Sequence, residues 1–238
     1  MSAAAPGTAG LVAVVTGGSS GIGRAVVDAL AAAGTSVVYW AEDPRLLPAS
    51  EREGVTGMVA DVTDSDAMAR LMATAVERYG GLDILVCSAG IQTYGTAEDT
   101  TEADWWRVID VNLTGAFLAA KHAIPWMRRR GAGAIVNVSS VQGQAPKRRV
   151  VGYSVSKAGL DGLTRSLAVD HAADNIRVNS VAPGPVDTPL LQVRDPPCLR
   201  PGERGRRPAP RASAGPGSPN PRRWPSSSSS SSARTPPT

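Results

Sequence analysis

Residues 11–34 read LVAVVTGGSSGIGRAVVDALAAAG. An apolar run is followed by a turn that contains Gly17, Gly21 and Gly23, and then by a helical pattern that stops at a glycine. Glycines in such a turn allow tight backbone angles and the close approach of a pyrophosphate, which the amino end of the following helix attracts. The spacing differs from the commonest G-x-G-x-x-G fingerprint, so a turn that is only tight remains the alternative to a dinucleotide site.

Further apolar runs alternate with helical patterns along the chain. The predicted strands are 11–15, 36–40, 57–60, 84–87, 134–138 and 177–181. The predicted helices are 22–33, 64–79, 101–130 with a break near Asn112, and 153–173. Strands that are apolar throughout and alternate with helices indicate a parallel sheet covered on both faces. This is a doubly wound α/β domain, whose ligands bind beyond the carboxyl ends of the strands.

The composition changes sharply near residue 193. Residues 1–193 contain 16 Lys and Arg against 19 Asp and Glu, whereas residues 194–238 contain nine Arg and two acids. The last segment also holds 11 of the 19 prolines and the serine run Ser226–Ser232. The basic charge therefore belongs to this tail, and it does not predict nucleic-acid binding by the folded part. We predict one folded domain over 1–193 and a disordered tail over 194–238, because the tail can bury almost nothing.

Cysteine usage and hydropathy exclude several classes of protein. Cys87 and Cys198 are too far apart for a metal or redox spacing, so we predict no metal site. No segment approaches the length of a membrane span, and the N-terminus lacks a basic region followed by an apolar one. These features predict a soluble cytoplasmic protein that does not contact a membrane.

A second chemical pattern lies in residues 137–157, NVSSVQGQAPKRRVVGYSVSK. Tyr153 and Lys157 are four residues apart on a predicted helix, so they share one face about a turn apart. A neighbouring ammonium favours the phenolate, and it should lower the phenol pKa from its usual value near 10. Ser140 follows a predicted strand, and its hydroxyl could hold a carbonyl or alcohol oxygen beside this pair. Tyr-x-x-x-Lys also occurs by chance in many helices, so the other motifs decide its meaning.

Those motifs are Thr16-Gly17-x-x-x-Gly21-Ile22-Gly23, Asp61-Val62, Ala89-Gly90, Asn112, Ser140, Tyr153-x-x-x-Lys157 and Arg177-x-Asn179-x-x-x-Pro183-Gly184-x-x-x-Thr188. In kind, order and approximate spacing they resemble the short-chain dehydrogenase/reductase family, from residue 11 to about residue 191. The resemblance implies a Rossmann-like fold. It also implies hydride transfer between NAD or NADP and a ketone, a secondary alcohol or a 3-oxoacyl thioester, with a small molecule as the substrate.

The resemblance implies four catalytic residues. Tyr153 would be the general acid in carbonyl reduction and the general base in alcohol oxidation. Lys157 would lower the pKa of Tyr153 and bind the nicotinamide ribose, while Ser140 would orient the substrate oxygen. Asn112 would hold a water that joins Lys157 to a proton relay, or it would cap a helix break. Ser139 is the alternative to Ser140, and the spacing from the tyrosine in the family favours Ser140.

The resemblance also implies a cofactor site. Asp61 would hydrogen-bond the adenine with Val62 packed beside it, and residues 183–188 would form the wall around the nicotinamide and the phosphates. The predicted cofactor-binding residues are Thr16, Gly17, Ser20, Gly21, Ile22, Gly23, Glu42, Asp61, Val62, Ala89, Gly90, Tyr153, Lys157, Pro183, Gly184, Val186 and Thr188.

The end of the second predicted strand favours NAD over NADP. Glu42 lies near the expected adenosine ribose, where a carboxylate can bond two hydroxyls but repels a 2′-phosphate. The usual acid of the family aligns with the alanine before it, so Glu42 must act from one residue further on. Arg24 and Arg45 are the alternative partners for a phosphate.

One departure from the family pattern and one cluster of cations bear on the site. Cys87-Ser88 replaces a pair of asparagines usual in the family, and we expect a less rigid backbone there. Lys147-Arg148-Arg149 lie between Ser140 and Tyr153, where they would either attract an anionic substrate or an acidic carrier protein, or form a solvated loop. Further candidates for the pocket are Gln142, Gln144 and Tyr94, whereas His122 and His171 are predicted to be structural.

The resemblance ends after Leu191, and the amino-acid sequence beyond it is typical of a GC-rich reading frame translated out of phase. The substrate-covering segment, the last helix and the last strand of the family are not legible there. Family members often assemble through that strand, so we expect a weakened homo-oligomer that pairs through 101–130 and 153–173. The alternative function is a catalytically incomplete nucleotide-binding remnant.

Overall fold

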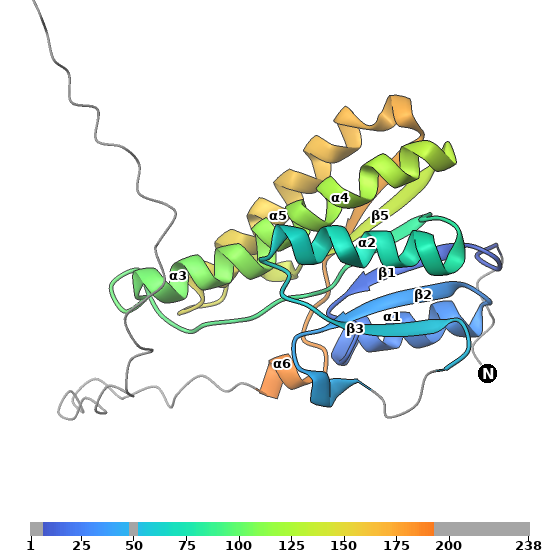
Figure 1. Ribbon diagram of the computed structural model, residues 1–238. Coiled ribbons are helices and arrows are strands. Elements are labelled where there is room, and N and C mark those ends of the chain that lie inside the picture. The colour runs from blue at the N-terminus through green and yellow to red at the C-terminus, as the bar shows by residue number, and fades with distance from the viewer. Residues whose placement is uncertain (1–6, 48–51, 193–238) are drawn as a thin grey trace, which may run out of the picture. The chain divides into compact units, whose positions relative to one another are not determined.

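The computed structural model describes residues 7–47 and 52–192 (Figure 1). Their strands form one six-stranded parallel sheet with the order β3-β2-β1-β4-β5-β6. The strands are β1 Val12–Thr16, β2 Ser36–Ala41, β3 Val55–Val59, β4 Ile84–Cys87, β5 Gly133–Val138 and β6 Ile176–Val181. The strand order reverses direction between β1 and β4, which creates a crevice beyond the carboxyl ends of these two strands. The predicted doubly wound fold is confirmed.

Helices cover both faces of the sheet (Figure 1). They are α1 Gly21–Ala32, α2 Ser65–Tyr79, α3 Glu102–Ile109, α4 Gly115–Arg130, α5 Val151–Asp170 and the short α6 Pro189–Gln192. Alternate residues of β1 enter two separate cores: Val12 and Val14 pack with α2, α4 and α5, and Ala13 and Val15 pack with α1. A strand buried on both faces must be apolar throughout, which explains the continuous apolar run at the start of the chain.

The predicted helix break near Asn112 is a π-helical turn, Asp110–Thr114, between α3 and α4. The Asn112 side chain is buried, and it pairs with both backbone groups of Ile91 at 2.8 and 2.9 Å. Its amide also donates to Ser156 Oγ of α5 at 2.9 Å. Single π-helical turns occur frequently at functional sites. Here the turn ties the loop after β4 to α5, which is the helix that carries Tyr153.

Other features bear on the remaining predictions. Among the described residues, no helix combines the length and the apolar character that a membrane crossing needs, and no group of three or more His, Cys, Asp and Glu could hold a metal. Phe117 of α4 and Val155 of α5 are exposed apolar residues on the two helices named for oligomer pairing, and the oligomer stays a prediction. The predicted tail over 194–238 lies outside the described residues.

Candidate functional site

A cleft opens at the carboxyl ends of the central strands, where the predicted crevice lies. Its walls come from the turn after β1, the loops after β4 and β5, the start of α5 and the segment after β6. The predicted site residues that line it are Gly17, Ser20, Gly21, Ile22, Gly90, Ser140, Tyr153, Lys157, Pro183, Gly184, Val186 and Thr188. The sheet therefore brings together segments that are more than 170 residues apart in the chain.

The glycine turn is closed too tightly for side chains. Gly17 has a positive φ of +66°, and a Cβ on it would come within 2.8 Å of the Ala89 backbone. A Cβ on Gly23 would overlap the carbonyl oxygen of Gly17. At the start of α1, the side chain of Ser20 makes no hydrogen bond to the helix, although it occupies the N-cap position. The backbone of the turn can therefore approach a pyrophosphate at the amino end of α1.

Thr16 supports this turn from behind. Its side chain is buried, and its Oγ1 accepts hydrogen bonds from the backbone N–H groups of Ser88 and Ala89 at 3.2 and 3.4 Å. These bonds join the ends of β1 and β4, where the sequence departs from the paired asparagines of the family. Thr16, Gly23 and Ala89 do not line the cleft; they hold the backbone that does.

Ser139 and Ser140 have different partners although they are neighbours. The Ser139 hydroxyl donates to the carbonyl oxygen of Lys157 at 3.3 Å, which fastens the end of β5 to α5. The Ser140 hydroxyl hydrogen-bonds the phenol of Tyr153, and its oxygen accepts from the N–H of Gln142 at 3.2 Å. Of the two serines, Ser140 is thus the one whose hydroxyl lies beside the phenol of Tyr153.

Burial controls the ionisation of Tyr153 and Lys157. Burial raises the pKa of Tyr153 above its ordinary value, although the hydrogen bond from Ser140 partly opposes this shift. Burial lowers the pKa of Lys157 to about 8, and the nearby Asp161 opposes that shift. Lys157 Nζ donates to the carbonyl oxygen of Val138 at 2.8 Å and lies 5.7 Å from the centroid of the Tyr153 ring. The expectation that Lys157 lowers the pKa of the phenol is therefore wrong for this structure, because desolvation outweighs an ammonium that is bonded elsewhere.

This burial makes stability depend on pH. Between about pH 8 and the ordinary lysine pKa near 10, the unfolded chain keeps the proton on residue 157 that the folded chain has lost. The free energy of unfolding should therefore rise with pH across this window, by up to about 3 kcal/mol, relative to Lys157→Met. Urea unfolding of both proteins at pH 7.5 and pH 10 measures the effect. Both proteins carry Cys87→Ala in this comparison, because the pKa of Cys87 is also shifted and depends on the charge of Lys157. Equal pH dependence of the two proteins would contradict this account.

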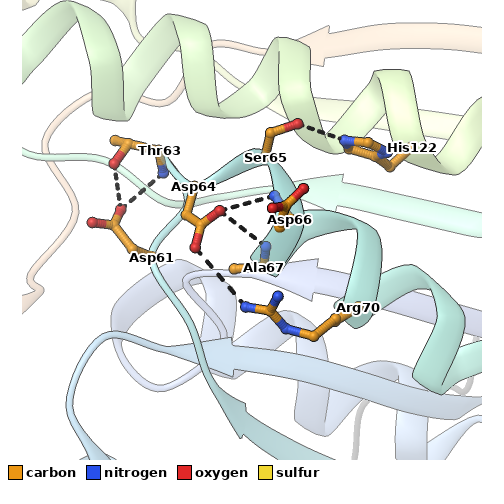
Figure 2. A network of polar contacts seen from close by, with 8 residues as sticks. All are labelled: Asp61, Thr63, Asp64, Ser65, Asp66, Ala67, Arg70 and His122. Carbon is orange, nitrogen blue, oxygen red and sulfur yellow. Dashed lines mark hydrogen bonds and ion pairs between the residues drawn. The ribbon is translucent and has the colours of Figure 1, made fainter. Parts of the chain in front are cut away.

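The predicted adenine-binding residues Asp61 and Val62 make contacts within the protein near the start of α2 (Figure 2). The exposed Asp61 accepts hydrogen bonds from the N–H and the hydroxyl of Thr63, both at 2.8 Å. Val62 is buried against the start of α4, where a Cβ on Gly115 would overlap it. Asp64 caps α2 by accepting from the N–H groups of its first turn. Asp61, Val62 and the exposed Glu42 do not line the cleft, so the structure does not bring them together with Tyr153.

The two arginines considered as phosphate partners are paired with carboxylates. Arg24 Nε lies 3.0 Å from Asp28 one turn along α1. The Arg45 guanidinium binds Asp43, and this hydrogen bond lowers the pKa of that carboxyl. Both cations are therefore paired with carboxylates close in the sequence, although Asp28 is shared with Arg52 at 3.3 Å.

Several lining residues were not among the predicted site residues. Of the three pocket candidates, Gln142 lines the cleft, whereas Gln144 and Tyr94 do not. Lys147 also lines it, whereas the histidines have structural partners, Ser65 for His122 and Asp174 for His171. Ser139, the alternative to Ser140, also lines the cleft, and the residues missed are Ser88, Gln92, Val138, Val141, Pro185, Pro189 and Leu190. Each of the missed residues lies within two positions of a predicted site residue in the chain, and this proximity was the only signal that could have found them.

Comparison with known proteins agrees with this geometry. A family model described as short chain dehydrogenase matches residues 11–197. The chain is 45% identical over 186 residues to the cis-4-hydroxycyclohexanecarboxylate dehydrogenase of Sinomonas cyclohexanicum, which covers 76% of this chain and 75% of the relative. It is 39% identical over 184 residues to the 3-alpha-(or 20-beta)-hydroxysteroid dehydrogenase of Mycobacterium tuberculosis, with coverages of 76% and 71%. The ligand-free aldohexose dehydrogenase of Thermoplasma acidophilum superposes with a TM-score of 0.71 at 37% identity, with coverages of 76% and 68%.

Proposed function

Because the chain belongs to the short-chain dehydrogenase family, whose members are NAD(P)-dependent oxidoreductases, we propose that its cleft transfers a hydride between NAD and a secondary alcohol or its ketone. One observation carries the proposal. Tyr153, Ser140 and the buried Lys157 line the same cleft as the glycine turn at the amino end of α1. A proton donor and an anion-binding turn in one cleft are the two parts that hydride transfer to a carbonyl requires of the protein.

The residues of the cleft fit a dinucleotide. Gly17 and Gly21 leave the space in which a pyrophosphate can reach the start of α1. A Cβ on Gly90 would lie 3.5 Å from Lys157 Nζ, so the backbone of Gly90 lies beside the ammonium. Gly184, Val186 and Thr188 would form the opposite wall. Asp61 and Glu42 would contact the adenosine outside the cleft, and Val62 would support that contact from the core.

The protein supplies proton transfer and orientation. When bound, the nicotinamide cofactor supplies or accepts the hydride. Ser140 holds the substrate oxygen beside Tyr153, which donates its proton to that oxygen in reduction and removes it in oxidation. Burial raises the pKa of the phenol, so Tyr153 holds the proton that reduction uses, whereas oxidation requires Tyr153 to lose that proton first. Lys157 would hold the cofactor ribose, and Asn112 fixes the loop after β4 through Ile91.

NAD is the proposed cofactor. The charge near the expected adenosine ribose supports it, since Glu42 is exposed after β2 while Arg24 and Arg45 are paired with carboxylates. An exposed carboxylate near the ribose would disfavour a 2′-phosphate, and the two arginines already have carboxylate partners. The names of the relatives, a hydroxycyclohexanecarboxylate dehydrogenase and a hydroxysteroid dehydrogenase, support a hydroxyl-bearing small molecule as the reduced substrate.

Turnover and binding together test the proposal. We expect NADH oxidation with members of a panel of cyclic and linear ketones, and a higher kcat/KM for NADH than for NADPH. NADH binding is measured in parallel by nicotinamide fluorescence. NADH binding without turnover of any ketone would support the remnant and contradict the proposed activity, whereas a preference for NADPH would contradict only the choice of cofactor.

A further inference from the structure

The three cations between Ser140 and Tyr153 differ in their ion pairing and in whether they line the cleft. Arg149 Nη1 pairs with Asp99 at 2.9 Å, so its charge is already neutralised. Arg148 is exposed and does not line the cleft. Lys147 is exposed and lines the cleft, and no carboxylate of the described residues forms an ion pair with it. Of these three cations, Lys147 is therefore the one that lines the cleft without a carboxylate partner.

The charged side chains that line the cleft are all positive. Among the described residues that line it, Lys147 and Lys157 are the charged ones, and no Asp or Glu accompanies them. Lys157 is buried, and its Nζ is bonded to the carbonyl oxygen of Val138. A cation at the wall of a cleft without carboxylates raises the local concentration of anions and disfavours cationic ligands. The cleft thus selects for an anionic group at the position of Lys147.

A second polar group in the same wall lacks a partner. The Oε1 atom of Gln142 is buried and accepts no hydrogen bond, although Gln142 lines the cleft two residues after Ser140. A buried amide without a partner is unfavourable, and a ligand with a polar group can satisfy it. Gln142 and Lys147 both lie in the segment between Ser140 and Tyr153, and both line the cleft.

We propose that Lys147 binds a carboxylate of the substrate, which makes the substrate an oxo acid in reduction and a hydroxy acid in oxidation. This inference rests on the proposed hydride transfer. Ser140 and Tyr153 hold the oxygen that reacts, and Lys147 holds the anionic end of the same molecule. An ammonium binds a carboxylate as a point charge through rotatable donors, so the distance between the two ends of the substrate can vary. Lys147 is a specificity-determining residue rather than a catalytic one.

Matched pairs of substrates test this inference. The probes are 4-oxopentanoate, 5-oxohexanoate and 4-oxocyclohexanecarboxylate, each compared with its neutral methyl ester, at saturating NADH. We expect the wild-type chain to have a higher kcat/KM for at least one acid than for its ester. Lys147→Gln should raise the KM for that acid about tenfold, the effect of losing a hydrogen bond to a charged group, and leave kcat and the ester unchanged. Lys147→Glu should raise the KM for the acid further.

Arg148→Gln is the matched control, since it removes a neighbouring exposed cation that does not line the cleft. It should leave the ratio of acid to ester unchanged. Equal turnover of acids and esters, or equal losses in Lys147→Gln for both, would overturn the inference and leave the proposed activity intact. A preference for a 3-oxoacyl thioester on an acidic carrier protein over every free acid would overturn it as well. No turnover with any pair would overturn the proposed activity, and this inference with it.

Discussion

Tyr153→Phe should reduce the turnover of any ketone substrate by about 10²–10⁴-fold, the usual contribution of a positioned general acid. The substitution removes one hydroxyl from a buried ring and keeps the shape of the side chain. The phenol is the group that Ser140 hydrogen-bonds in the cleft, so its loss leaves the substrate oxygen without a proton donor. NADH binding should change little, because the glycine turn and Lys157 are intact. Steady-state kcat and a fluorescence titration with NADH measure the two effects separately.

Tyr79→Phe is the matched control for this variant. The Tyr79 hydroxyl bonds Thr56 Oγ1 at 2.9 Å, and neither residue lines the cleft. Its removal should lower the free energy of unfolding by about 1 kcal/mol and leave kcat unchanged. If Tyr153→Phe kept a turnover close to that of the wild-type chain, Tyr153 could not be the general acid. A loss of NADH binding in parallel with turnover would instead assign it a structural role.

Gly23→Ala should weaken NADH binding by at least about tenfold. The added Cβ would overlap the carbonyl oxygen of Gly17, which is backbone and cannot rotate away as a side chain can. The turn must therefore open, and the backbone moves away from the position in which it approaches the pyrophosphate. Overpacking of this kind typically lowers the free energy of unfolding by about 1–3 kcal/mol. NADH titration and urea unfolding of the same preparation separate lost binding from lost folding.

Gly162→Ala provides the matched glycine substitution. Gly162 lies within α5, and the only atom within 4 Å of its Cβ position is Arg165 Nη2 at 3.9 Å. Alanine there should raise the free energy of unfolding by about 0.5–1 kcal/mol, because glycine is unfavourable inside a helix, and NADH affinity should stay the same. If a folded Gly23→Ala variant bound NADH like the wild-type chain, the glycine turn could not be part of the cofactor site.

The apolar runs predicted the inner strands of the sheet, since a strand buried on both faces must be apolar along its length. The edge strand β6 was also predicted, although Arg177, Asn179 and Ser180 within it are polar and exposed. The ends of several strands differ from the predicted ones by one or two residues. The third strand was predicted at 57–60 and is Val55–Val59, because the turn at Gly54 places Val55 beside Val37 of β2. The break near Asn112 was also predicted, but its form was not. A π-helical turn depends on the contacts of Asn112 with Ile91 and Ser156, which lie on other elements.

The sequence by itself determined the alternation of strands and helices, the glycine turn and the one-turn separation of Tyr153 and Lys157, because these depend on residues close together in the chain. Only the tertiary structure decided that burial, rather than the neighbouring charge, controls the pKa values of Tyr153 and Lys157. It also decided that Arg149 is neutralised by Asp99, 50 residues earlier, while Lys147 faces the cleft. Desolvation and ion pairing depend on which distant segments pack together, and local sequence patterns do not carry that information.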